Sequence, residues 1–353
     1  MPNPIALFAA ATLIPVPLLL MGAFFGGIWI VLAILYLGAI AFALDEFVPV
    51  TVVQADERSF PAADQLSVVL GVAHFILLGV GLWAMTGGTG LGWSGILAVF
   101  LGYGLFFGQI SNSNAHELIH RSDKRLFQLG MWVYVSLLFG HHTSAHRHVH
   151  HRFVATDEDP NTAQLDESFY TFAPRAWAGS FRAGYEMEQA LNGRLSGQSG
   201  RRRLNPYMIY TVGGLGCVVA TVILFGPGAL IAYPLLAAYA QAQLLMSDYV
   251  QHYGLTRRRL PGGKTEPVGV VHSWNAPHWF TGLMMLNAPH HSAHHAHPAR
   301  PYPALDLPPA DAAPSLPYSL PAMAVLALHP RLWRKVMNPR AQAWRNAATP
   351  AEA

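Results

Sequence analysis

Six long apolar runs constrain this chain more strongly than any other feature of its sequence. Each has about twenty residues, the length that a helix needs to cross the hydrocarbon core of a bilayer. Hydrophobic residues make up 52% of the 353 and charged residues only 12%, which favours an integral membrane protein over a large soluble core. We therefore expect an all-α fold with about six transmembrane helices, at 4–22, 24–44, 66–86, 92–111, 207–226 and 228–248.

The segments outside these runs complete the expected organisation. Apolar stretches at 127–140, 279–288 and 316–328 are too short to span a bilayer and are predicted to be interfacial or re-entrant. Residues 1–345 are expected to form one membrane-embedded domain, and the Ala/Pro-rich tail, 346–353, is expected to be disordered.

Basic residues are distributed unevenly between the two sides of the membrane. The turns near Gly22, at 87–91 and at 226–228 contain no Lys or Arg, so all 22 basic residues are expected on the other side. The positive-inside rule makes that side the cytoplasm, with both termini and every histidine cluster. The first run is predicted to be a retained span, because no basic residue precedes Arg58. We expect a multi-pass protein of a bacterial-type inner membrane, whose pI near 9.0 reflects loops that face anionic lipid rather than nucleic acid.

Histidines gather in three clusters near the ends of apolar runs. The chain has 18 histidines, and sixteen of them lie between His116 and His297. Neutral imidazole is the commonest protein ligand for iron, copper, nickel and zinc. His116 and His120 are four residues apart and would share one face of a helix, as would His146 and His150. The ligand candidates of the three clusters are His116 and His120; His146, His150 and His151; and His291, His294 and His295.

The number of clustered histidines predicts two metal ions. Neighbouring residues on a helix point about 100° apart, so His150 and His151 can reach two metals or bracket one. Eight or nine converging histidines far exceed what one zinc ion needs. A zinc-protease interpretation of His116–His120, with Glu117 as the general base, would explain only two of the histidines.

Nearby acidic residues are candidates for orienting the ligand rings. Glu117 lies inside the first cluster, and Asp248 lies one helical turn before the isolated His252. One member of the acidic run after the second cluster is expected to hold a ligand imidazole, as metal-bound histidines generally require. The members of that run are Asp157, Glu158 and Asp159.

The single cysteine limits how electrons could reach such a centre. Cys217 lies inside the fifth apolar run, so the chain has neither an internal disulfide nor a Cys-x-x-Cys module for an iron–sulfur or rubredoxin-like centre. Redox chemistry at the histidines would therefore need electrons from a separate protein.

Together, these motifs resemble the membrane-bound non-haem diiron family of fatty acid desaturases, hydroxylases and alkane monooxygenases, whose three boxes read HxxxH, HxxxHH and HxxHH. Within it, the chain is most similar to the alkane 1-monooxygenases and their aryl-methyl relatives such as xylene monooxygenase. The resemblance covers about 20–305. The motifs that carry it are His116–Arg121, His151–Pro160, His252–Leu255, His272–Asn275 and His291–Pro298.

The resemblance implies a set of site residues. Two family positions, His272 and His297, are expected to support the ligands or the fold, and His290 competes as a ligand. The implied metal ligands are His116, His120, His146, His150, His151, His252, His291, His294 and His295. The chain departs from the family where relatives usually carry acids, at Gln251, Ala145 and Ala293.

The resemblance also implies an activity. Two iron ions would use O2 to hydroxylate a terminal methyl group of an alkane, or of an alkyl or aryl-methyl compound, to a primary alcohol. Rubredoxin, reduced by a flavin-dependent rubredoxin reductase, would donate the electrons. One alternative is a fatty acid desaturase or hydroxylase of the same superfamily, which the segments at His252 and His272 disfavour. A second is a non-enzymatic metal-binding membrane protein, although transporters generally place ligands near the bilayer midplane.

Overall fold

The computed structural model describes residues 4–48, 57–199 and 203–347, and helices dominate all three ranges. Within these ranges there is no β-strand, and the only β-pairing consists of two isolated bridges, Arg259 with Thr265 and Asn275 with Ser315. The all-α prediction is therefore confirmed. Most of the tail predicted to be disordered, 348–353, lies outside the described residues, and the single-domain boundary stays a prediction.

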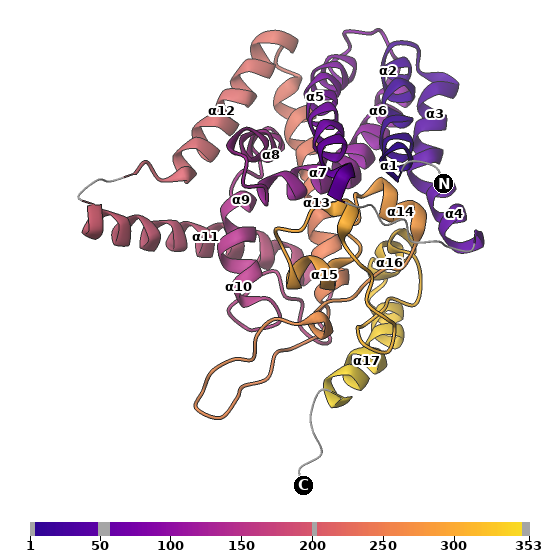
Figure 1. Cartoon of the computed structure of the whole chain (residues 1–353). Coiled ribbons are helices and arrows are strands. Elements are labelled where there is room, and N and C mark those ends of the chain that lie inside the picture. The colour runs from indigo at the N-terminus through magenta and orange to yellow at the C-terminus, as the bar shows by residue number, and fades with distance from the viewer. Residues whose placement is uncertain (1–3, 49–56, 200–202, 348–353) are drawn as a thin grey trace.

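Six helical segments are long and apolar enough to cross a membrane, which confirms the predicted number. They run side by side in the upper part of Figure 1. In chain order they are α1 (Pro4–Leu13) with α2 (Pro15–Phe25); α3 (Gly27–Leu35) with η1 (Tyr36–Ile40) and α4 (Ala41–Phe47); η2 (Glu57–Ser59) with α5 (Phe60–Met85); α6 (Trp93–Phe106) with η3 (Phe107–Ser111) and α7 (Asn112–Ile119); α12 (Pro206–Phe225); and α13 (Ala229–His252).

Two of these segments extend well beyond their apolar runs. The fourth continues through the π-helical turn η3 to Ile119, and the sixth continues to His252. The sixth ends there because Tyr253 turns to extended backbone and Gly254 follows with a positive φ of 69°. Continuous helices therefore carry His116 and His252 from the bilayer-spanning part to the polar end of the molecule.

Shorter helices build the polar end. The three short apolar stretches form α8 (Lys124–Ser136), α14 (Trp279–Met284) and α16 (Leu320–Ala327), and none of them is a candidate span. Their interfacial or re-entrant placement stays a prediction. The remaining elements are α9 (His142–Ala145), η4 (His146–His150), α10 (His151–Phe153), α11 (Phe169–Ser199), η5 (Val270–His272), α15 (His291–Ala296), η6 (Tyr302–Ala304) and α17 (Pro330–Ala347).

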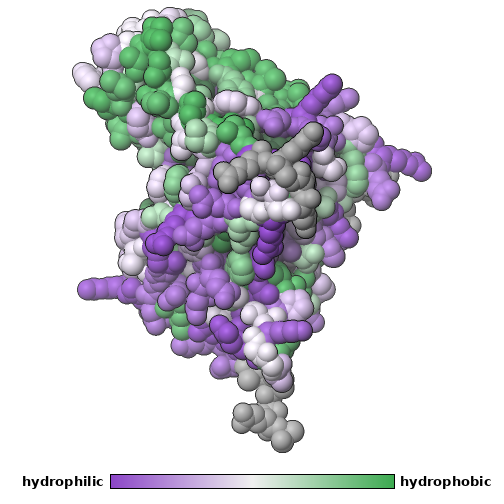
Figure 2. Space-filling model, turned by 90° about the vertical axis from the view of Figure 1, so that its left-hand side faces the viewer, coloured by the Kyte–Doolittle hydropathy of each residue, from purple (hydrophilic) through white to green (hydrophobic). Residues whose placement is uncertain are grey.

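The surface divides into an apolar and a polar part. Hydrophobic residues cover the end formed by the spanning helices, and hydrophilic residues cover the opposite end (Figure 2). Trp93 and Ile223 on the spanning helices are 87% and 77% exposed, which is unfavourable in water but not in lipid. The long helix α11 runs across the spanning helices rather than along them (Figure 1).

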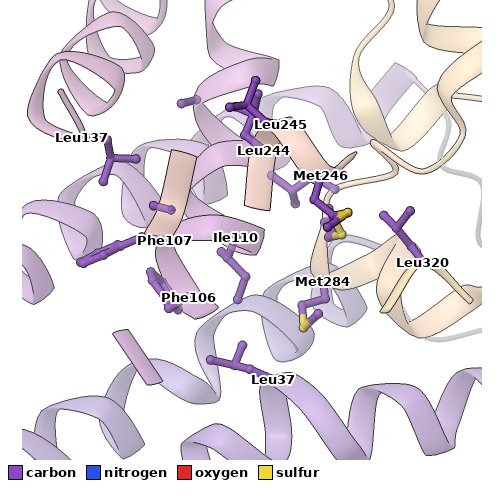
Figure 3. Packing of buried hydrophobic residues seen from close by; sticks show 14 of the residues in the cluster. Leu37, Phe106, Phe107, Ile110, Leu137, Leu244, Leu245, Met246, Met284 and Leu320 are labelled. Carbon is purple, nitrogen blue, oxygen red and sulfur yellow. The ribbon is translucent and has the colours of Figure 1, made fainter. Parts of the chain in front are cut away.

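The fourth and sixth spans pack closely through a glycine. A Cβ atom added at Gly104 would lie 2.0 Å from the Tyr239 ring on α13. Gln243 of α13 donates to the Gly104 carbonyl at 2.7 Å, and Asn112 donates to the Ala240 carbonyl at 2.9 Å. Buried side chains of the same two spans, among them Ile110 and Leu244, belong to the hydrophobic core that Figure 3 shows. The contact fixes the two helices that carry His116 and His252.

We predict that Gly104→Ala lowers thermal stability in detergent, because the added methyl group forces α6 and α13 apart. Overpacking of this kind costs about 1–3 kcal/mol. Gly79→Ala on α5 is the matched control, since a Cβ there meets nothing within 4 Å. Helix propensity favours Ala over Gly by about 1 kcal/mol, so the control should be neutral or stabilising. Equal melting temperatures for the two variants would contradict the close packing.

Candidate metal centre

All nine histidines predicted as ligands converge at the polar end of the spanning helices, in two groups. Within each group the nearest ring nitrogens lie within 4.8 Å of one another. The five-histidine group consists of His116, His120, His146, His151 and His294. The four-histidine group consists of His150, His252, His291 and His295. Residues far apart in the sequence thus form two adjoining clusters, and their role as metal ligands stays a prediction.

The five-histidine group is centred on His146. The Nε2 atom of His146 lies 2.8 Å from Nε2 of His116 and 2.9 Å from Nε2 of His151. Nε2 of His294 lies 3.1 Å from Nε2 of His151. His120 completes the group from the residue after α7, and its buried Nε2 has no hydrogen-bond partner among the described residues.

The four-histidine group is centred on His291. Its Nε2 lies 2.9 Å from Nε2 of His252 and 3.1 Å from Nε2 of His295. The Nδ1–H of His291 donates to the Ala288 carbonyl at 3.3 Å, which leaves the Nε2 lone pair facing the group. The rings of His151 and His295 have centroids 4.6 Å apart, so the two groups adjoin.

A π-helical turn divides the second cluster between the two groups. Residues His146–His150 form η4, in which the hydrogen-bonding pattern is wider than in an α-helix. His146 and His151, five residues apart, face the same group, whereas His150 faces the other. The rings of His146 and His150 lie side by side, with centroids 5.1 Å apart, as their spacing predicts, but they belong to different groups. Of the two arrangements left open for His150 and His151, the structure has the pair reaching both groups.

Burial keeps these imidazoles neutral, which is the form that binds metal. Burial, and then the neighbouring imidazoles, hold the pKa of His146, His151 and His295 well below the ordinary value. His150 differs. Burial lowers its pKa, but the carboxylates of Asp159 and Asp248 outweigh that effect and raise the pKa overall.

Asp159 is the member of the acidic run that holds a histidine. The Nδ1–H of His150 donates to Asp159 Oδ2 at 2.8 Å, and both side chains are buried. The Nε2 of His150 has no hydrogen-bond partner among the described residues and belongs to the four-histidine group. Asp157 and Glu158 are exposed, so only Asp159 of the three predicted residues holds a histidine of the groups.

The other two acidic candidates hold different partners from those expected. Asp248 Oδ2 accepts from Asn161 Nδ2 at 2.6 Å, rather than bonding to His252. Glu117 forms an ion pair with Arg121 at 3.0 Å and accepts from the Tyr302 backbone N–H at 3.1 Å. Glu117 therefore ties α7 to the segment that follows α15.

The three remaining candidate histidines lie outside both groups. His272 donates through Nε2 to Glu266 at 3.1 Å and accepts at Nδ1 from the Gly269 N–H, so it closes its own loop. His290 is held by the Leu305 carbonyl, 3.1 Å from its Nδ1. His297 is exposed. The structure therefore gives His290 no part in either group.

Two residues of the Ser-Trp-Asn motif support the ligands, and sequence reasoning had weighed only its histidine. Asn275 Oδ1 accepts from the backbone N–H of Ser292 at 3.1 Å and from its hydroxyl at 3.0 Å, which fixes the start of α15 beside His291. Trp274 is fully buried and donates to the Tyr253 carbonyl at 2.9 Å, next to His252. The motif therefore connects the sixth span to the third cluster.

The donor set fits a pair of metal ions. Each neutral imidazole carries one N–H and one lone pair, so nine rings at these separations cannot satisfy one another by hydrogen bonds alone. The buried Nε2 atoms of His120 and His150 have no partner in the part of the chain that the structure describes. Imidazole nitrogens are ligands for iron, copper, nickel and zinc. Two cations bound by these lone pairs would give each ring nitrogen a partner, which the hydrogen bonds alone cannot do.

An inner cavity lies against both groups. The space between its lining residues is about 420 Å³, counted with its open side, and His116, His146 and His291 form the wall toward the two groups. The exposed surface of the wall is mostly apolar, with Leu244 and Met285 among its contributors, although most of the lining side chains also carry a polar group. The remaining lining residues are Gly108, Asn112, Ser113, Tyr134, His142, Ser247, Asp248, Gln251 and Ala288.

Comparisons with known proteins agree with this arrangement. The model of the fatty acid desaturase family matches residues 91–326, which include all nine histidines. The alkane 1-monooxygenase of Pseudomonas putida is 34% identical over 299 residues, covering 82% of this chain and 70% of the relative. That of Ectopseudomonas oleovorans is 35% identical over 294 residues with the same coverage, and alkane 1-monooxygenase 1 of Alcanivorax borkumensis is 34% identical over 256 residues, covering 70% and 60%. The chain therefore belongs to the fatty acid desaturase family and, within it, to the alkane 1-monooxygenases, which are oxidoreductases.

Proposed function

We propose that this protein binds two iron ions in its histidine groups and hydroxylates the terminal methyl group of an alkane, or of an alkyl or aryl-methyl compound. The observation that carries the proposal is the inner cavity, whose largely apolar wall brings a hydrocarbon directly against histidines of both groups. The names of the relatives support an alkane as the substrate. The five-histidine group would hold one iron ion and the four-histidine group the other.

The overall reaction fixes what must reach the site. One alkane, one O2, two electrons and two protons yield one primary alcohol and one water. A bound pair of iron ions would supply the reductive activation of dioxygen. The protein has one cysteine, so the electrons come from another protein, which we propose to be rubredoxin reduced by a flavin-dependent rubredoxin reductase.

A second cavity gives the rest of the alkyl chain a place. The space between the residues of this outer cavity is about 480 Å³, counted with its open side, and the cavity shares Gly108, Ser247 and Met285 with the inner one. Met246 and Leu320 line it from α13 and α16, and their side chains lie near each other in Figure 3. Because an alkane offers no hydrogen-bonding group, shape and apolar contact must position it. The two cavities together would hold the reacting methyl group inside and the remaining chain outside, toward α16.

The polar end that carries the histidines is proposed to face the cytoplasm of a bacterial-type inner membrane. The loops at the opposite end, near Gly26, at Thr86–Gly92 and at Gly226–Gly228, contain no Lys or Arg. This asymmetry is what the positive-inside rule expects. His120 and His151 are partly exposed, whereas the four-histidine group is buried. Electrons from a soluble donor would therefore arrive at the five-histidine side.

The first prediction from this proposal concerns the Asp159–His150 pair. His150→Ala should abolish turnover and lower bound iron while leaving membrane insertion intact. Asp159→Asn should weaken iron retention against a chelator by about 10–100-fold, the usual effect of removing a carboxylate that orients a ligand histidine. The exposed neighbour Asp157→Asn is the matched control and should retain iron like the unaltered chain. Full activity in His150→Ala would remove that histidine from the site.

The second prediction concerns chain length. Met285 lines both cavities, so Met285→Phe should narrow the passage between them. A long alkane should then lose at least about tenfold in kcat/KM, because even one misplaced methylene in an apolar pocket costs that much. A short alkane that fits the inner cavity provides the internal control. Equal losses for both alkanes would argue against an alkyl path through the outer cavity.

Product analysis separates hydroxylation from desaturation. Purified protein with rubredoxin, its reductase and NADH should convert octane to 1-octanol. An alkene as the main product from an acyl chain, without alcohol from octane, would favour the desaturase alternative instead.

A further inference from the structure

One carboxylate stands in the otherwise neutral wall of the inner cavity. Asp248 of α13 is the only Asp or Glu among the described residues that line it, and it shares the wall with His116, His146 and His291. Asp248 is buried, with 6% of its surface exposed. An alkane gains nothing from a charged group, so the carboxylate needs a different explanation.

A short chain of hydrogen bonds links Asp248 to the four-histidine group. Asn161 Nδ2 donates to Asp248 Oδ2 at 2.6 Å, and the Asn161 backbone N–H donates to Asp159 Oδ1 at 3.1 Å. Asp159 in turn accepts from His150 at 2.8 Å. Two buried carboxylates therefore lie beside the same histidine group, one behind His150 and one on the cavity side.

Of the three buried acids near the histidine groups, Glu117, Asp159 and Asp248, the described structure gives an Arg or His partner to all but Asp248. Glu117 is paired with Arg121, and Asp159 accepts the N–H of His150. Within the described residues, Asp248 has no ion pair with an Arg or Lys, and its hydrogen bond comes from a neutral amide. A buried carboxylate without a counter-charge is costly, and such groups are usually paired or bound near metal ions.

The proposed metal centre would have the opposite imbalance, an excess of positive charge. Nine neutral imidazoles contribute no negative charge, so two ferrous ions would bring four positive charges into the site, and the Asp159 carboxylate behind His150 would offset only one of them. Bound cations are commonly the largest local charges in a protein, and nearby anions stabilise them. The unpaired carboxylate and the uncompensated metal charge would offset each other.

We propose that Asp248 is the cavity-side counter-charge of the four-histidine metal ion and lowers its reduction potential. This inference rests on the proposed diiron function. A negative charge at this place stabilises the more positive oxidised ion relative to the reduced one. Asp248 belongs to neither group of converging histidines, so it would act on the metal ion through its charge and not as a ligand.

The test is the midpoint potential of the full chain in nanodiscs, together with iron retention against a chelator. Asp248→Asn preserves shape and the contact with Asn161 but removes the charge. It should shift the reduction equilibrium at least about tenfold toward the ferrous state, about 59 mV for a one-electron couple. Glu186→Gln, which removes an exposed carboxylate on α11, is the matched control and should leave the potential unchanged.

A second variant distinguishes charge from local structure. Gln251 lines the same cavity one helical turn from Asp248, so Asp248→Asn combined with Gln251→Glu returns a carboxylate to that wall. The double variant should recover most of the lost shift. An unchanged potential in Asp248→Asn, or a shift that the double variant does not reverse, would overturn the proposal.

The iron content of each variant separates a failure of this inference from a failure of the diiron function. If Asp248→Asn loses its iron, the double variant must regain it, and failure to do so overturns the proposal. Absence of iron from the unaltered chain would overturn the diiron function and this inference together. If Asp248→Asn keeps two iron ions and the midpoint potential of the unaltered chain, the proposed role of Asp248 is wrong, but the diiron function stands.

Discussion

The mutual approach of nine imidazoles, six of them buried and three partly exposed, is the constraint on which the rest of this structure depends. Their ring nitrogens cannot all be satisfied by hydrogen bonds within the groups. The cations that we propose would share the lone pairs, and the surrounding fold keeps the rings in place. Three features of the fold do this. The Gly104–Tyr239 contact fixes two spanning helices, the π-turn η4 divides the second cluster, and Asn275 fixes α15.

The burial that keeps the rings neutral also shapes the chemistry of the cavity. The surface of the inner cavity is mostly apolar, which suits a substrate without polar groups. The wall nonetheless carries Asp248, and its charge has a physical role only if a cation lies nearby. Substrate binding and charge compensation would then use the same wall.

The sequence predicted the architecture well because its signals are long or repeated. Six apolar runs identified six spans, and all nine histidines named in advance converge. Local chemistry was harder. The spacing placed the rings of His146 and His150 side by side, but their division between two groups occurs in a π-turn that is not visible in the order of residues. The selection of Asp159 over Asp157, and the roles of Asn161 and Asn275, depend on contacts between distant segments that no local pattern encodes.

The most direct test of a two-metal centre is a metal analysis of the purified chain combined with Mössbauer spectroscopy of iron-57-enriched protein. The account predicts two iron ions per chain in unequal environments, because one group has five histidines and the other has four beside two carboxylates. A single metal ion, zinc in place of iron, or no metal in a folded and membrane-inserted protein would contradict it.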